Sequence, residues 1–250
     1  MVTFSIAQWQ GWTSGIEDAS SWKHWAEHPY CPVGETCPPR LEFLPPMQRR
    51  RLTPMARSVF ECAWPVADGH AAMPLVFASR HGETTRNFGL LQSLAAGEPL
   101  SPTAFGLSVH NAIAGQWSII RRETTESVAL SVEDDGLEHA FLEAGLLLAD
   151  GHANVLVVLA EERPPAPYAP WIADVPFSYA AAFRLRAGAD WRLESAAEPD
   201  LPDTPRADAS GAAASQPWPN TLNLLRHLAL QTPTWRHANR ARQWLWTRSA

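Results

Sequence analysis

The segment between residues 126 and 160 constrains the fold of this chain more than any other part of the sequence. It reads ESVALSV, then DDGLEHAFLEAGLLLADG, then the uninterrupted apolar run NVLVVLA. Asp134 and Asp135 are good helix N-cap residues. One helical stripe of apolar residues follows, formed by Leu137, Ala140, Phe141, Ala144, Leu147 and Leu148. The last run lacks alternation, which is typical of a strand covered on both faces. This order predicts a right-handed βαβ unit in a mostly parallel sheet.

Composition excludes several classes of protein. The 250 residues are 46% hydrophobic and 18% charged, as in an ordinary globular protein. The net charge of −6 argues against sequence-independent binding of nucleic acid, which needs Lys and Arg to neutralise phosphates. No apolar run approaches the roughly 20 residues that span a bilayer, and the N-terminus lacks the order of a signal peptide. With three cysteines, too few for a disulfide framework, we expect a cytoplasmic protein.

The sequence divides into three parts. Residues 1–190 predict one α/β domain, in which residues 47–64 form a long helix that Pro54 either bends or begins, and residues 101–120 form another helix. Residues 191–219 are rich in Ala, Pro and Asp and predict a flexible linker. Residues 220–250 predict a C-terminal tail of two helices, LNLLRHLALQ and WRHANRARQWLW, that dock back on the body.

One short motif suggests an enzyme. The run Arg80-His81-Gly82-Glu83-Thr84 is similar to the signature of the histidine phosphatase family, in which the histidine accepts a phosphoryl group. In that family the motif follows the first strand and a second histidine follows a later strand. Here some 75 residues precede the motif, and His152 comes before the apolar strand rather than after it. Phosphatase chemistry on His81 stays open as an alternative function.

A second pattern suggests a metal. His24, His28, Cys31 and Cys37 form H-x3-H-x2-C-x5-C, and all four are residue types that zinc accepts as ligands. The spacing matches no established zinc module, and histidines that merely flank a helix would explain it equally well. A zinc-stabilised binding module is therefore a further alternative, and the sequence otherwise implies no metal or cofactor.

A broader match covers about residues 1–190. Ser108, Asn111, Ala114 and Gly115 form S-x-x-N-x-x-A-G, and the βαβ segment with its turn at residues 151–154 follows. Together they resemble the N-terminal half of β-ketoacyl synthases. The resemblance implies a thiolase-like α/β fold, a mixed and mostly parallel sheet between helices, with a degenerate C-terminal part.

The departures from that family imply a loss of catalysis. Ketosynthases carry a nucleophilic cysteine at the start of the helix in this βαβ unit, whereas this chain has Asp134 there and no cysteine after Cys62. Too few residues follow the linker to build the family's C-terminal half, which supplies a pair of histidines. The chain thus resembles the chain length factors, degenerate subunits that pair with an active ketosynthase. The run LPP-x-x-RRR and the Trp-rich N-terminus resemble the type from aryl polyene clusters.

This resemblance implies partners rather than a reaction. A chain length factor forms a heterodimer with an active β-ketoacyl synthase and helps to shape the tunnel for an acyl chain carried by acyl carrier protein. We expect interface or tunnel residues in the predicted helix over residues 101–120. The candidates, for each of which ordinary core packing is the competing interpretation, are Phe105, Val109, His110, Asn111 and Trp117.

Overall fold

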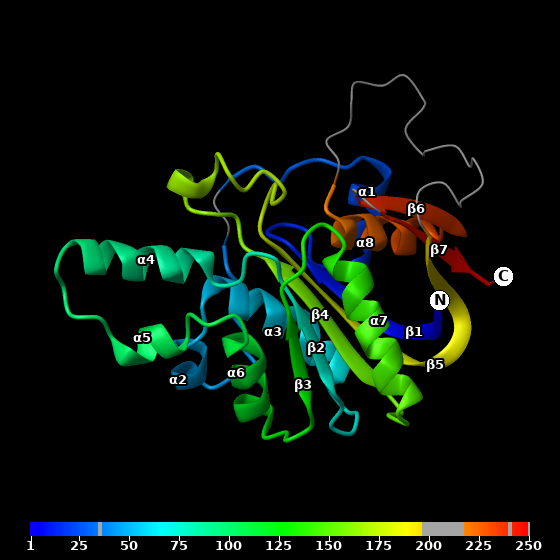
Figure 1. The fold of residues 1–250 in the computed structure, drawn as a ribbon, viewed down its shortest axis with the longest axis horizontal. Helices are drawn as coiled ribbons and strands as arrows, with labels where there is room; N and C mark the ends of the chain where they lie inside the picture. The colour runs from blue at the N-terminus through cyan, green and yellow to red at the C-terminus, as the bar shows by residue number, and fades with distance from the viewer. Residues whose placement is uncertain (35–36, 197–217, 240–241, 250) are drawn as a thin grey trace.

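A mixed β-sheet forms the central layer of the protein (Figure 1). The computed structural model describes residues 1–34, 37–196, 218–239 and 242–249. Within these residues the sheet has seven strands in the order β3-β2-β4-β5-β7-β6, and β1 also pairs with β5. The strands are β1 (Val2–Trp12), β2 (Leu75–Ala78), β3 (Ser127–Leu130), β4 (Val155–Glu161), β5 (Tyr179–Ala196), β6 (Thr234–Asn239) and β7 (Arg242–Arg248). β2 runs parallel to both β3 and β4, and the other pairings are antiparallel.

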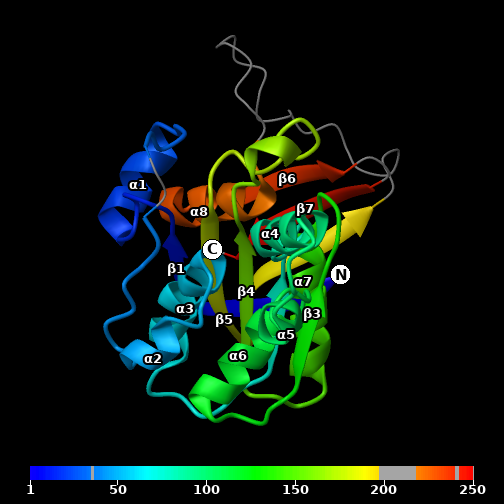
Figure 2. The same cartoon turned by 90° about the vertical axis from the view of Figure 1, so that its left-hand side faces the viewer.

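Helices cover both faces of this sheet, as the apolar run of β4 predicts (Figure 2). They are α1 (Ala19–Glu27), α2 (Pro46–Arg49), α3 (Pro54–Ala67), α4 (Thr84–Ala95), α5 (Pro102–Gly106), α6 (Ala112–Arg121), α7 (Gly136–Ala149) and α8 (Asn220–Leu230), with a 3₁₀ turn at Ala166–Tyr168. Successive β4 residues alternate between two buried clusters. Val157 packs with α7, α1 and α8, whereas Val158 packs with α3 and α6.

The predicted βαβ unit is present as β3, α7 and β4. The two strands are not neighbours, however, because β2 lies between them and pairs with both. A crossover that skips one strand leaves the local sequence pattern unchanged, so the pattern alone does not reveal it. The apolar stripe of α7 is buried against β2, β4 and β5 as expected.

Two predicted helices have different boundaries. Pro54 begins a helix rather than bending one: it is the first residue of α3, and Thr53 Oγ1 caps that helix by accepting from Ala56 N at 3.1 Å. The predicted helix over residues 101–120 is interrupted between α5 and α6. The break is stabilised by Ser108, whose hydroxyl donates to the Phe105 carbonyl, a local alternative to helical hydrogen bonding that serine favours.

The secondary structure of the C-terminal tail differs from the sequence prediction. α8 forms as expected, but the segment predicted as a second helix forms β6 and β7 instead. β7 pairs with residues 191–196, which therefore extend β5 and are not linker. Within the rest of the predicted linker, residues 197–217 lie outside the described residues, and Trp218 and Pro219 line the cavity described below. Among the helices that the structure describes, none is long and apolar enough to cross a membrane.

Candidate functional site

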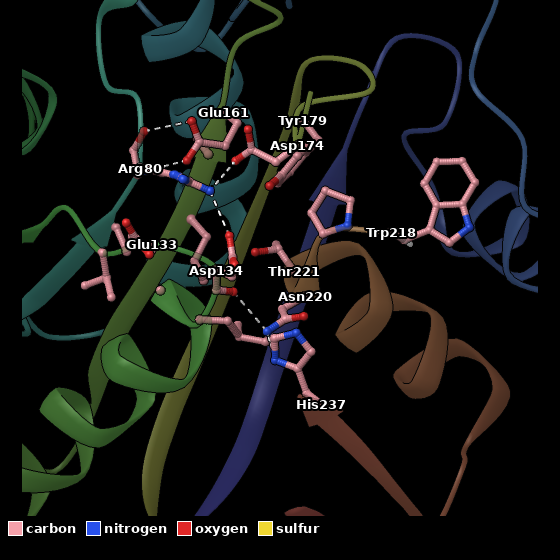
Figure 3. A pocket seen from close by; sticks show the side chains of 18 of the residues that line it. Arg80, Glu133, Asp134, Glu161, Asp174, Tyr179, Trp218, Asn220, Thr221 and His237 are labelled. Atoms are coloured by element: carbon pink, nitrogen blue, oxygen red, sulfur yellow. Dashed lines mark hydrogen bonds and ion pairs between the residues drawn. The ribbon is translucent and has the colours of Figure 1, made fainter. Parts of the chain in front are cut away.

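A cavity of about 570 Å³ opens where the parallel strands end and α7 begins (Figure 3). The carboxyl edge of a parallel sheet is where α/β folds usually bind ligands. Its wall has four sources: the carboxyl ends of β2, β3 and β4 with the residues that follow β2 and β3, the first turn of α7, the loop that leads into β5, and the C-terminal segment. The polar lining residues include Ser79, Arg80, Glu133, Asp134, Glu161, Asp174, Tyr179, Asn220, Thr221 and His237.

Asp134, the residue expected at the nucleophile position, lies on this wall just before α7. Its carboxylate accepts a hydrogen bond from Arg80 Nη1 at 2.7 Å. Arg80 also reaches Asp174 at 3.1 Å, so the guanidinium lies between two carboxylates (Figure 3). Burial opposes ionisation of Asp174, but the hydrogen bond and charge of His81, with Arg80, outweigh it and lower the pKa of this carboxyl.

Asp135 is the N-cap residue of α7 but does not cap the helix with its side chain. The carboxylate is instead buried and accepts from Trp244 Nε1 of β7 at 3.1 Å. His139 lies 3.4 Å from the same oxygen. The C-terminal hairpin is thus bound to the first turn of the helix that carries the site.

Glu161, the last residue of β4, organises the loop that contains the phosphatase-like motif. Its carboxylate accepts from the backbone amides of Arg80 and His81 and from Ser79 Oγ. Burial raises the pKa of Glu161 to about 7, although these hydrogen bonds lower it. The sequence analysis missed this residue. A carboxylate that directly follows a buried parallel strand is the signal that could have found it.

Carboxyl groups from two other segments hold His81 in place. Its Nε2 lies 3.0 Å from Asp174, and its backbone amide is held by Glu161. No second histidine is hydrogen-bonded to His81 or in ring contact with it among the described residues. His110, one of the interface candidates, holds the same loop by donating from Nε2 to the Ser79 carbonyl at 2.7 Å.

A second polar cluster lies beneath the cavity, inside the protein. Glu138 of α7 is fully buried and accepts from Trp246 Nε1 at 3.2 Å and from Asn220 Nδ2 at 3.0 Å. Burial raises the pKa of Glu138 to about 8. Burial also lowers the pKa of its neighbour His237 to about 4, against the charges of Asp135 and Asp134. Both groups are therefore neutral near pH 7. The sequence analysis missed this cluster because its members come from distant segments.

The five interface candidates fall in different environments. Phe105 is 62% exposed and Val109 45% exposed, and Asn111 is also exposed. Trp117 is 3% exposed and contacts the rings of Phe60 and Trp64, so it belongs to the core and offers no surface to a partner. For Trp117 the competing interpretation, ordinary core packing, is the one the structure supports.

The predicted zinc ligands do not form one group among the described residues. His24 and His28 lie together on α1, but the third potential ligand beside them is Glu27 and not a cysteine. Cys31 and Cys37 are exposed in the segment that follows α1.

The fold and this site define a class of protein: a thiolase-like α/β protein whose strand-edge cavity carries a salt-bridged carboxylate at the start of the central helix. The sequence model of the β-ketoacyl synthase N-terminal domain matches residues 22–247, and the chain therefore belongs to this family. A search of curated proteins found no significant match.

Solved structures agree with that assignment. The chain is 28% identical to a chain in the complex of the ketosynthase ApeO with its chain length factor ApeC from Xenorhabdus doucetiae, with a TM-score of 0.82 over 99% of this chain and 100% of that chain. It is 14% identical to the ishigamide ketosynthase/chain length factor, with a TM-score of 0.62 over 79% of this chain and 68% of that chain. A β-ketoacyl synthase from Burkholderia phymatum STM815 is 16% identical, with a TM-score of 0.56 over 92% and 70%.

Proposed function

We propose that this chain is a chain length factor, a non-catalytic subunit that pairs with an active β-ketoacyl synthase in polyketide biosynthesis of the aryl polyene type. In this role it helps to shape the tunnel that holds an acyl chain delivered by acyl carrier protein. The observation that carries the proposal is the ion pair between Asp134 and Arg80 at the start of α7, where we infer that Asp134 takes the place of the family's nucleophilic cysteine.

A carboxylate in this environment cannot replace the thiol. Acyl transfer in the family needs a thiolate near a helix N-terminus, where the dipole favours its negative charge. The sequence has no cysteine beyond Cys62, which is buried within α3, where burial raises the pKa of its thiol well above the usual value. Asp134 is instead neutralised by Arg80 in a salt bridge of 2.7 Å.

The charge of the cavity also opposes catalysis on an anionic substrate. Four carboxyl groups line it, those of Glu133, Asp134, Glu161 and Asp174, against the single guanidinium of Arg80. Arg80 is already bonded to two of them. A wall of this sign repels a substrate that carries a free carboxylate, because like charges raise the energy of binding in a partly enclosed site.

The coverage of the matched chain supports the choice of subunit. In the complex of ApeO with its chain length factor ApeC, the chain that matches ours is covered completely, so the two are of nearly equal length. The β-ketoacyl synthase from Burkholderia phymatum extends further, since only 70% of it is covered. A match that covers all of the chain in the complex of ApeO with ApeC fits a subunit of a pair of this kind.

A projecting pair of helices supports a partner. α4 and α5 extend away from the sheet (Figure 1), and neither contains a buried residue. Their exposed apolar side chains and those next to them are Leu91, Leu94, Leu100, Phe105 and Val109. Apolar side chains gathered on an extended surface normally mark a protein interface. We call residues 84–109, which contain α4 and α5, the arm. We therefore propose that the arm is the surface of this chain that contacts the ketosynthase.

Co-expression with the ketosynthase from the same gene neighbourhood tests the proposal. Size-exclusion chromatography with mass detection should find a one-to-one complex, and product analysis should find acyl chains of defined length only when both subunits are present. In a double variant, Phe105→Asp with Val109→Asp, the complex should be lost. Val33→Asp is the matched control, because Val33 is fully exposed and lies outside the arm. A chain that stays monomeric beside the ketosynthase, or equal behaviour of the two variants, would contradict the proposal.

A further inference from the structure

One face of α1 carries three potential metal ligands that the proposed function does not use. The helix is capped by Asp18 and buries Trp22, Trp25 and Ala26 on its inner face. Its outer face carries His24 and Glu27, His28 follows as the C-cap residue, and all three are exposed. Residues three and four apart on a helix are neighbours, so this spacing brings their side chains together.

The geometry of these side chains suits a single ion. One potential ligand atom from each residue lies within 4.8 Å of the other two. The imidazole rings of His24 and His28 are 5.9 Å apart between centroids. Bonds from zinc to nitrogen are about 2.0 Å long, so two ligands of one ion lie about 3 to 4 Å apart. Small rotations about the side-chain bonds of exposed residues close that difference.

We propose that His24, Glu27 and His28 form a surface site for Zn²⁺, with water completing the coordination. Two imidazoles and one carboxylate are a ligand set that zinc uses in proteins, and two histidines four residues apart on one face of a helix bind zinc in metalloproteases. Imidazole selects transition ions over Mg²⁺ and Ca²⁺, which prefer oxygen ligands. Because the site lies on an open helix face, it binds an ion without forming a catalytic pocket.

The competing ligand set contains the cysteines. A site built on His24, His28, Cys31 and Cys37 would involve the segment after α1, whereas the proposed site lies on the helix alone. The potential ligand atoms that lie close together belong to His24, Glu27 and His28, and this group includes neither cysteine. The two possibilities therefore differ in which substitutions remove the metal, and the role of the chain as a ketosynthase partner does not enter into either.

A bound ion would stabilise a part of the molecule that supports the cavity. His28 is the C-cap of α1, and its amide donates to the His24 carbonyl, so one ion would cross-link the last turn of the helix. The inner face of that turn contacts the C-terminal segment: Arg226 of α8 donates to the Ala26 carbonyl at 2.8 Å. Trp25 packs edge-on against Trp218, which lines the cavity.

Isothermal titration of the full-length, untagged chain with ZnCl₂, after removal of metal by a chelator, tests the site. We expect one zinc ion per chain and no heat change above dilution with MgCl₂. His24→Ala and His28→Ala should each weaken zinc binding by at least about tenfold, since even supporting residues around metal ligands have effects of that size. Lys23→Ala, on the exposed face of the same helix, is the matched control and should bind as the wild type does.

A second variant and a second readout make the result decisive. The double variant Cys31→Ser with Cys37→Ser should keep its zinc affinity, and Glu27→Gln should lose affinity. Zinc should also raise the melting temperature of the wild type in a concentration-dependent way, because a ligand that binds only the folded state stabilises it. His24→Ala should abolish that rise while its circular dichroism spectrum stays that of the wild type. Absence of saturable binding, or loss of binding in the cysteine variant with retention in Glu27→Gln, would overturn the proposal.

Discussion

Replacing Glu138 by glutamine should change how the stability of the protein depends on pH. Glu138 is fully buried beneath the cavity, and burial raises its pKa from an ordinary 4.5 to about 8. Between these two values the folded chain holds a proton that the unfolded chain has released. The unfolding free energy therefore falls as pH rises through this window, and the contribution is lost above pH 8. A permanently neutral glutamine removes that dependence.

The contribution of Glu138 is best separated from those of other titrating groups between pH 7 and 8. His227 and His237 have pKa values lowered from 6.5 to about 4, so they make stability rise with pH only below about 6.5. Glu161, with a pKa raised to about 7, adds to the fall mainly below pH 7. From pH 7 to pH 8, Glu138 alone should cost the wild type about 1 kcal/mol of unfolding free energy.

Urea denaturation of the isolated chain at pH 6.5, 7.0, 7.5 and 8.0 measures this effect. Glu138→Gln should be less stable at pH 6.5 by about 1–3 kcal/mol, because the amide cannot satisfy both Trp246 and Asn220 as the carboxyl does. Its curve should nevertheless be flatter than that of the wild type by about 1 kcal/mol between pH 7 and 8. Glu143→Gln, half-buried on the same helix, is the control and should follow the wild type. Parallel curves for Glu138→Gln and the wild type would show that Glu138 is already ionised at pH 7 and would refute the reasoning.

Three further predictions follow from the structure. Trp117→Ala should lower the unfolding free energy by about 3–5 kcal/mol in chemical denaturation because it empties a packed core site. Phe105→Ala should change the unfolding free energy by less than about 0.5 kcal/mol but should weaken the ketosynthase complex in a pull-down. Similar stability of the two variants would contradict the assignment of Trp117 to the core and Phe105 to the surface. Asp134→Cys should give the complex no additional condensing activity in a product assay, since under the proposed function this chain does not supply the family's histidine pair, and new turnover would contradict the proposed role. Gly11→Ala should lower the unfolding free energy by about 1–3 kcal/mol in thermal denaturation, because a Cβ there would lie 2.8 Å from the Trp22 ring. Gly89→Ala, in open space on α4, should instead raise the unfolding free energy by up to about 1 kcal/mol. Equal effects of the two variants would be evidence against the packing of Trp22 on Gly11.

The parts of the fold that could be predicted are those set by local periodicity. The stripe of α7 and the apolar run of β4 each lie within one segment, and both elements form as expected. The position of β2 between β3 and β4 depends on pairings between distant residues, such as Leu75 with Ser127 and with Leu156. Nothing within the βαβ segment encodes those pairings, so the order of the strands could not be predicted.

The site shows the same division. The place of Asp134 before α7 follows from the pattern of the helix, but its partner Arg80 is 54 residues earlier in the chain. The loop with Arg80 and His81 suggested chemistry as a motif, whereas its conformation is determined by Glu161 from another strand. A short motif specifies residue types but not their neighbours. Its meaning therefore depends on which strand ends beside it.

The C-terminal hairpin shows why the tail was assigned wrongly and why it matters for the site. Trp244 and Trp246 are two apart, which places them on one face of a strand but on opposite sides of a helix. The charged residues around them are compatible with a surface helix, so the segment is predicted as a helix although the spacing of the two tryptophans is that of a strand. In the strand both indoles point inward and donate to Asp135 and Glu138 on α7. The start of α7 is therefore covered by the tail of its own chain. Because those two acceptors are carboxyl groups at the start of α7, the segment that follows Asp134 also anchors the hairpin.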